Sequence, residues 1–323
     1  MNYETFLLHR DQMRVVRPDL LDLSELNVYR SLSFPPIAPS TQAEAPYRCH
    51  FAERFLSHLG LSQTLKARAQ VSHGVRRSLR ALFGFLAGRQ ARVGIPDDVY
   101  PVYLQLAAEA GMSVVPFASR LGLPALGSLD ALLLCEPLKP WGTSLTEDEA
   151  DELTSWVRAD PRRCLMLDSA YATPPTPVAL RLLEADVAIV LVSLSKAWLL
   201  PDHGGLCIVP TNLKVDVRPV FAELPKDESK IRTAYAALTE CQHRPTEVAL
   251  HLAVRARRLD AITESLPSLK ATRCVSYFAT CRLSLEELLA MGVLAAPSSV
   301  FGGPCDISIL SSLRPCGVPR PAP

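Results

Sequence analysis

The sequence lacks the patterns that mark several classes of protein. Its net charge is only +1 over 323 residues, so no basic surface for nucleic acid is expected. No apolar run is long enough to span a membrane. The nine cysteines and seven histidines are scattered, without a Cys-x-x-Cys pair or any other metal-ligand spacing. The sequence therefore predicts no nucleic-acid, membrane or metal partner.

The first residues also lack the features of a secretory signal peptide. Charged residues, among them Glu4, Arg10 and Asp11, interrupt the stretch where a signal peptide has a continuous apolar segment. An odd number of dispersed cysteines is typical of reduced, mostly buried thiols rather than of a disulfide framework. We therefore expect a cytoplasmic protein.

What the sequence does have is enough apolar content for a large core. Hydrophobic residues make up 48% of the chain, which supports one large α/β domain and a smaller one. Short runs rich in Val, Ile and Leu predict buried strands at Ala131–Cys135, Cys164–Leu167 and Val187–Leu191. Buried runs of this kind are typical of a mainly parallel sheet with helices on both faces.

Local signals mark several helices. After Gly74, apolar residues recur at helical spacing from Val75 to Leu86, which predicts an amphipathic helix. Thr146 and Glu149 have the spacing of a capping box and predict the start of another helix. We expect a long helix at Thr246–Leu266 that links the large domain to the small one.

Two of the predicted strands end in polar groups. One is followed by Asp168 and Tyr171, and the other by Ser193, Ser195 and Lys196. Neighbouring parallel strands bring their carboxyl ends to one edge of a sheet, where open α/β sheets bind ligands. Pyridoxal 5'-phosphate requires these groups: an amine to form an imine with its aldehyde, a carboxylate for its ring nitrogen and a phenol for its ring hydroxyl.

The same residues carry a resemblance to a known family. Residues 168–171 have the pattern Asp-x-Ala-Tyr, and residues 193–196 have the pattern Ser-x-Ser-Lys. With both motifs in this order, the chain resembles the fold-type I pyridoxal phosphate enzymes, and most closely the class I and II aminotransferases. The resemblance implies a three-layer α/β sandwich with a mainly parallel central sheet, a smaller carboxyl-terminal α/β domain and a homodimer.

The resemblance also divides the chain into segments. It implies an amino-terminal arm at residues 1–46, a large cofactor-binding domain at 47–245, and a linking helix with a small domain at 246–313. The Pro-rich tail at 314–323 is expected to be disordered. In the resembled family the arm crosses the mouth of the site, but a surface strap explains the sequence equally well and is the interpretation we prefer.

Further cofactor contacts follow from the resemblance. Residues 72–75 form a strand-to-helix turn, where free backbone amides bind phosphate and a glycine allows close approach. This turn matches the phosphate loop of the family, and Tyr100 matches the tyrosine that stacks on the pyridine ring. The resemblance thus assigns these residues to cofactor binding: Ser72, His73, Gly74, Val75, Tyr100, Asp168, Tyr171, Ser193, Ser195 and Lys196.

Two cofactor positions depart from the family pattern. Lys139 stands where an asparagine normally bonds the ring hydroxyl. Three roles stay open for Lys139: holding a phenolate oxygen, pairing with Asp168, and binding an acidic group of the substrate. Gly204 stands where an arginine normally binds the phosphate. The phosphate charge must then be met by His203, Arg76 or Arg77, or by backbone amides alone.

The substrate end departs as well. The arginine that binds the substrate carboxylate in the family falls on or near Asp306, where a carboxylate would repel that group. Arg314 is the alternative cation at this end of the chain. Asp306 also makes a cationic or carboxylate-poor amine a conceivable substrate.

We expect a pyridoxal phosphate-dependent aminotransferase that acts on an amino acid or related amine through Lys196, with Asp168 and Tyr171 as catalytic partners. Two alternatives stay open: a lyase, γ-replacement or carbon–carbon bond-forming enzyme of a specialised biosynthetic pathway, and a degenerate homologue that only binds. Ser193 and Lys196 also fit the Ser-x-x-Lys of penicillin-binding proteins and β-lactamases. That family needs Ser-Asp-Asn and Lys-Thr-Gly motifs, which the sequence lacks.

Overall fold

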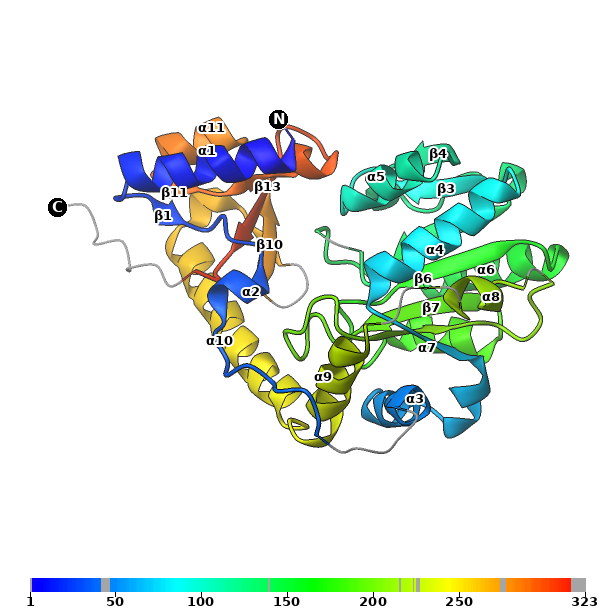
Figure 1. The fold of residues 1–323 in the computed structure, drawn as a ribbon. Helices are drawn as coiled ribbons and strands as arrows, with labels where there is room; N and C mark the ends of the chain where they lie inside the picture. Colours follow the sequence, from blue (N-terminus) through cyan, green and yellow to red (C-terminus); the bar gives the residue numbers. More distant parts are fainter. Residues whose placement is uncertain are drawn as a thin grey trace.

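The computed structural model describes residues 2–41, 47–138, 140–214, 216–222, 224, 227–273 and 277–314. Within these residues the chain forms a large α/β body and a small α/β body, which the helices α9 (Glu228–Thr239) and α10 (Arg244–Ser265) connect. Figure 1 shows the two bodies beside each other, with the connecting helices in yellow along one side.

The large body is built around a seven-stranded sheet in the order β2-β8-β7-β6-β5-β3-β4. Strands β7, β6, β5, β3 and β4 are parallel to one another, whereas β8 is antiparallel to both β7 and β2. The prediction of a mainly parallel sheet is confirmed. The strands are β2 (Ala69–Ser72), β3 (Arg92–Pro96), β4 (Ser113–Phe117), β5 (Ala131–Cys135), β6 (Cys164–Asp168), β7 (Ala188–Ser193) and β8 (Gly205–Ile208).

Helices cover both faces of this sheet and complete three layers. Apolar residues of α3, α6, α7 and α9 pack on one face, and those of α4, α5 and α8 pack on the other. Strands β5, β6 and β7 are buried along their whole length, which explains their continuous apolar sequences. The remaining helices are α3 (Tyr47–His58), α4 (Val75–Gly88), α5 (Val102–Glu109), α6 (Glu147–Ala159), α7 (Pro177–Glu184) and α8 (Arg218–Ala222).

The predicted helix signals are confirmed. Gly74 precedes α4, and the expected capping box of Thr146 and Glu149 opens α6. The long helix expected near Thr246–Leu266 is α10. Short 3-10 helices lie at η1 (Gln63–Arg68), η2 (Ser119–Leu121), η3 (Leu126–Ser128), η4 (Pro267–Leu269) and η5 (Ser298–Phe301).

The small body contains a second sheet, in the order β12-β13-β10-β9, in which all pairs are antiparallel. A capping box of Ser284 and Glu287 opens its helix α11. Its carboxyl-terminal elements are β9 (Thr272–Arg273), β10 (Phe278–Cys281), α11 (Leu285–Ala290), β11 (Val293–Leu294), β12 (Ala296–Pro297) and β13 (Ser308–Ser311).

The amino-terminal segment differs from the surface strap that the sequence predicts. Its elements are α1 (Tyr3–Val16), β1 (Leu21–Asp22) and α2 (Val28–Ser31). Strand β1 pairs in parallel with β11, and Phe6 and Leu23 are fully buried in the small body. Burial of these apolar side chains explains why the segment does not lie on the surface. We propose that residues 3–32 belong with 246–313 to the small domain, and that 47–245 forms the large one.

Ion pairs fasten this segment to the end of the described chain. Asp22 Oδ2 accepts a hydrogen bond of 2.7 Å from Arg14 and one of 2.7 Å from Arg314. Asp22 Oδ1 accepts bonds from the backbone and hydroxyl of Ser24. The rest of the tail predicted to be disordered, 315–323, lies outside the described residues. Within the described part of the chain, no helix combines the length and the apolar character needed to cross a membrane.

We expect Asp22→Asn to lower the free energy of unfolding by about 2 kcal/mol at neutral pH, because charge-assisted hydrogen bonds to two arginines are weakened. Asp19→Asn is the matched control: Asp19 pairs with the exposed Arg17 in the same segment, and the loss of this solvent-screened pair should change the free energy of unfolding little. Chemical denaturation measures both. Equal losses in the two variants would contradict the anchoring role of Asp22.

The stability that Asp22 contributes should also depend on pH. Burial raises the pKa of Asp22, but hydrogen bonds from Ser24 and Arg14 outweigh this effect and hold it below its ordinary value of 3.8. The contribution is therefore complete above the unfolded-state pKa and is lost as pH falls through the lower folded-state pKa. The difference between wild type and Asp22→Asn should shrink over that acidic range.

Candidate active site

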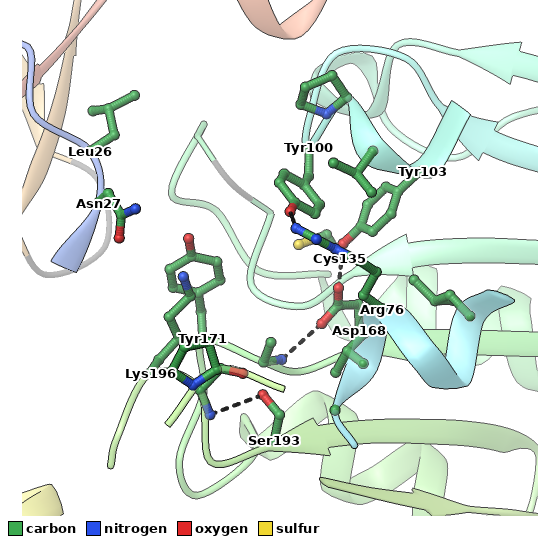
Figure 2. Close-up of a pocket in the computed structure, with 18 of the residues that line it drawn as sticks. Leu26, Asn27, Arg76, Tyr100, Tyr103, Cys135, Asp168, Tyr171, Ser193 and Lys196 are labelled. Carbon is green, nitrogen blue, oxygen red and sulfur yellow. Dashed lines mark hydrogen bonds between the residues drawn. The ribbon is translucent and has the colours of Figure 1, made fainter. Parts of the chain in front are cut away.

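A cavity of about 380 Å³ lies at the carboxyl ends of β6 and β7. The large body contributes Asp168 and Lys196 to its lining, and the small body contributes Tyr3 and Phe278. Figure 2 shows Asp168, Lys196 and Tyr171 on the side of the large body, with Leu26 and Asn27 across the opening. The cavity therefore lies at the sheet edge that the sequence predicts, and both bodies enclose it.

Strand pairing brings the acid and the amine to the same edge. Asp168 is the last residue of β6 and lies opposite Leu191 of β7, and Lys196 follows the end of β7 by three residues. Both side chains line the cavity together with Tyr171. The three catalytic residues predicted from sequence are thus neighbours in space.

Hydrogen bonds hold the Asp168 carboxylate in place. Tyr103 of α5 donates to Oδ2 at 2.5 Å, and the backbone N–H of Ala170 donates to Oδ1 at 2.9 Å. Burial raises the pKa of Asp168 above its ordinary value, although both hydrogen bonds and the charge of Lys196 act against this rise. A buried carboxylate that lines a cavity favours a cationic partner there, because a cation relieves its loss of hydration.

Two tyrosine rings flank the lysine. The Lys196 Nζ lies 4.9 Å from the ring centre of Tyr29 and 4.7 Å from that of Tyr171, within the range of cation–π attraction. The Tyr29 hydroxyl donates to the backbone carbonyl of Ser195. Burial raises the pKa of the Tyr171 phenol well above its ordinary value. The phenol is therefore neutral near pH 7 and is able to donate a hydrogen bond.

The turn before α4 forms a cradle for an anion. Gly74 has φ +108°, and a Cβ built on it would lie 3.9 Å from both the Ser193 Cβ and the Ser195 Oγ. A Cβ on Gly205 would lie only 2.9 Å from the Gly74 Cα, so this close approach requires glycine. Gly74, Val75, Ser193 and Ser195 all line the cavity. Backbone amides at a helix start, beside two hydroxyls, are suited to binding phosphate.

Three predicted cofactor residues support this turn instead of lining the cavity. The Ser72 hydroxyl is buried and lies 2.7 Å from the Ser78 hydroxyl. His73 Nδ1 lies 3.2 Å from the backbone carbonyl of His203, and its Nε2 accepts a bond of 3.1 Å from the backbone N–H of Asp227. The His203 ring bonds the carbonyl of Pro201 at 2.7 Å. These contacts hold the loops around the cradle.

Position 204 has no room for the arginine that the resemblance leads one to expect. A Cβ on Gly204 would lie 2.8 Å from a ring atom of Phe51 and 2.9 Å from the Cβ of Ala234. Arg76, in the first turn of α4, lines the cavity instead, and its Nη2 donates to the Tyr100 hydroxyl at 2.7 Å. Of the cations that the sequence leaves open for phosphate, Arg76 is thus the one among the described lining residues.

The remaining predictions have different outcomes. Tyr100 lines the cavity, 41% exposed, whereas Lys139 lies outside the described residues. Asp306 is exposed and outside the lining, and Arg314 is paired with Asp22 at 2.7 Å. The two proposed substrate residues are therefore not brought to the cavity. Ile309 is the residue of β13 that lines it.

Sequence reasoning missed Tyr29 and Tyr103. Tyr103 follows Tyr100 by three residues at the start of a helix, so the two side chains share one side of it, and their rings meet edge-on at 5.5 Å. That spacing was a usable signal. Tyr29 reaches Lys196 only because the amino-terminal segment folds back into the small body, and no local pattern marks that contact.

The site does not have the arrangement of a Ser-x-x-Lys hydrolase. Ser193 ends a strand, whereas the nucleophilic serine of that family begins a helix. Within the described residues, no cluster of three or more His, Cys, Asp or Glu side chains is placed to hold a metal ion.

Comparisons with known proteins agree with this geometry. A family model described as aminotransferase class I and II matches residues 37–259. LL-diaminopimelate aminotransferase of Chlamydia pneumoniae is 33% identical over 109 residues, which are 32% of this chain and 27% of that protein. The enzyme of the same name from Methanosphaera stadtmanae is 29% identical over 146 residues, 38% of this chain. The matched stretches span only 27% and 35% of the lengths of these two relatives.

Solved structures share the fold over nearly the whole chain. An aminotransferase from Mycobacterium tuberculosis has a TM-score of 0.70 and 19% identity, covering 96% of this chain and 91% of its own. LL-diaminopimelate aminotransferase from Chlamydomonas reinhardtii has a TM-score of 0.71 and 16% identity, with coverages of 97% and 92%. At these identities the likeness concerns the fold alone.

Tyr103→Phe should lower the free energy of unfolding of the ligand-free protein by about 2 kcal/mol at pH 7, because Asp168 loses a hydrogen bond to a charged group. The lost bond should raise the pKa of Asp168 further above its ordinary value of 3.8. A raised folded-state pKa destabilises the fold as pH rises through it. The deficit of the variant should therefore grow from acidic to neutral pH.

Denaturation across this pH range measures the effect of Tyr103→Phe. Tyr100→Phe is the control, since the Tyr100 side chain is exposed and its hydroxyl bonds the exposed Arg76, and this bond should contribute about 0.5 kcal/mol or less. A deficit in Tyr103→Phe that is independent of pH would argue against its action on Asp168.

Proposed function

The chain belongs to the class I and II aminotransferase family, whose members use pyridoxal phosphate, and from this premise we propose that it transfers the amino group of a small-molecule amine or amino acid. The single observation that carries the proposal is the convergence of Lys196, Asp168 and Tyr171 in one cavity. The donor would become a carbonyl compound, and a second carbonyl compound would accept the amino group.

The described residues fit the cofactor group by group. The start of α4 at Gly74 suits an anionic phosphate, and the buried Asp168 suits a cationic ring nitrogen. Lys196 is an amine for the aldehyde, and the neutral phenol of Tyr171 is a donor for the ring oxygen. When bound, the cofactor supplies an electron sink that eases loss of a proton from the carbon bearing the amine.

The residues of this chain then have separate tasks. Lys196 accepts the proton from the amine-bearing carbon and returns a proton during transfer. Asp168 would hold a proton on the ring nitrogen of the bound cofactor, and Tyr103 orients Asp168 through its bond of 2.5 Å. Tyr171 would donate a hydrogen bond to the ring oxygen, and Tyr100, which lines the cavity, would supply a stacking surface for the ring.

A binding protein without activity is the second candidate function, motivated by the altered positions Lys139, Gly204 and Asp306. The presence of Lys196, Asp168 and Tyr171 together favours the enzyme, because packing alone does not require an amine, a carboxylate and a phenol in one cavity. The same three residues would also serve a lyase, γ-replacement or carbon–carbon bond-forming enzyme of a specialised pathway. LL-diaminopimelate, named in two curated relatives, is one donor to test.

We also propose a cytoplasmic homodimer with a biosynthetic role, as is typical of the family. Exposed apolar side chains support an association surface: Val15 on α1 is 80% exposed and Leu250 on α10 is 63% exposed. Val254 lies one turn after Leu250 and is also exposed, so the two form a common apolar strip on α10.

Visible absorbance tests the proposed function directly. Purified protein mixed with pyridoxal phosphate should develop a bound-cofactor band, and borohydride should then fix the cofactor covalently on the peptide that contains Lys196. Lys196→Ala should lack the covalent product while keeping its fold by circular dichroism. A folded wild-type protein without such a band would contradict the proposal that the protein is a pyridoxal phosphate-dependent enzyme.

Arg76→Gln should weaken pyridoxal phosphate binding about tenfold to a hundredfold, because a charge-assisted contact with the phosphate is lost. Arg77→Gln is the matched control, one residue further along α4, exposed and outside the lining. Titration of the cofactor band gives both affinities. Pyridoxal without phosphate adds a second comparison, since its binding should be little changed by Arg76→Gln; an equal loss would contradict a phosphate contact.

A further inference from the structure

The small body gives the cavity an apolar wall opposite the cofactor residues. Among the described lining residues, seven come from the small body, and none of these seven carries a charge: Tyr3, Leu26, Asn27, Tyr29, Phe278, Phe301 and Ile309. Four of the seven are aromatic and two are aliphatic. We refer to these seven residues as the small-body wall.

The small-body wall is part of a packed core. Phe278 and Ile309 are buried in the hydrophobic cluster of the small body, and Tyr3 and Phe301 pack against the same cluster. The Tyr3 and Phe301 rings lie 5.5 Å apart. Because core packing fixes these side chains, the wall presents a shaped surface rather than a flexible one.

The wall stands close to the reacting amine. The ring of Tyr29, one of its members, lies 4.9 Å from the Lys196 Nζ. A donor whose amine meets Lys196 therefore extends its remaining atoms between the cofactor residues and the small-body wall. The chemistry of the wall decides which donor side chains are stabilised there.

An aromatic side chain suits this wall better than a charged one. Burying an apolar ring removes its surface from water, and ring–ring contacts add to that gain. A carboxylate against the same wall would lose hydration without gaining a charged partner from it. Asp202 also lines the cavity, and its charge would repel a second carboxylate on the donor.

We propose that the amino donor carries an aromatic side chain that packs on the small-body wall, as in an aromatic amino acid or an arylalkylamine. This inference rests on the proposed function, because it names the substrate class of the same site. Dicarboxylic donors are disfavoured by the same wall. The donor is thus selected by the segment of residues 3–32, the strands β10 and β13, and the 3-10 helix η5.

The test follows the bound-cofactor band of the loaded wild-type protein in single-turnover reactions with separate amines. The apparent second-order rate constant for L-phenylalanine should be about 30-fold higher than that for L-alanine, the increase expected from burial of the ring. The rate constant for L-glutamate should not exceed that for L-alanine. 2-Phenylethylamine shows whether the α-carboxylate is needed: reaction with either aromatic donor supports the inference.

Variants of the wall sharpen the test. Phe301→Ala should lower the ratio of the L-phenylalanine rate to the L-alanine rate about fivefold to tenfold. Phe85→Ala is the matched control, because Phe85 is also a partly buried ring of the chain but lies outside the cavity lining. Its ratio should equal that of the wild type.

The outcomes separate the two proposals. A loaded protein that reacts with L-glutamate as fast as with L-phenylalanine, or with no aromatic donor, overturns the aromatic substrate class and leaves the cofactor assignment standing. Equal ratios in Phe301→Ala and Phe85→Ala overturn the role of the wall. Absence of a bound-cofactor band overturns the proposed function itself, and the inference with it.

Discussion

The register between the parallel strands β6 and β7 is the constraint on which the site depends. Pairing of Asp168 with Leu191 sets the carboxylate and the following lysine at one edge of the sheet. A shift of one residue would turn the side chains of a strand to the opposite face and separate the acid from the amine. Both strands are buried along their whole length, so the packing that stabilises the core also fixes the chemistry.

Local sequence was sufficient for the elements whose signals are local. The apolar runs of β5, β6 and β7, the capping box at Thr146 and the helix after Gly74 depend on neighbours along the chain, and all were predictable. So were the cavity positions of Asp168 and Lys196, because carboxyl ends of neighbouring parallel strands share an edge.

Contacts between distant segments were not predictable in the same way. Tyr29 meets Ser195 across 166 residues of sequence, and β1 pairs with β11 near the other end of the chain. The prediction of a surface strap was therefore wrong for residues 3–32. The position of the phosphate-binding arginine was also not predictable from motif spacing, which pointed to position 204. The packing of Phe51 and Ala234 around Gly204 leaves no room for an arginine there, and Arg76 lines the cavity instead.

The pairing of β1 with β11 has a consequence for synthesis on the ribosome. The small body needs both the first and the last described elements, whereas the sheet of the large body is complete once β8 has emerged. Domains fold as units while the chain is made, so the large body is able to fold first. Until β13 emerges, Phe6 and Leu23 have no finished core to enter, so they stay exposed to solvent for longer than the apolar side chains of the large body.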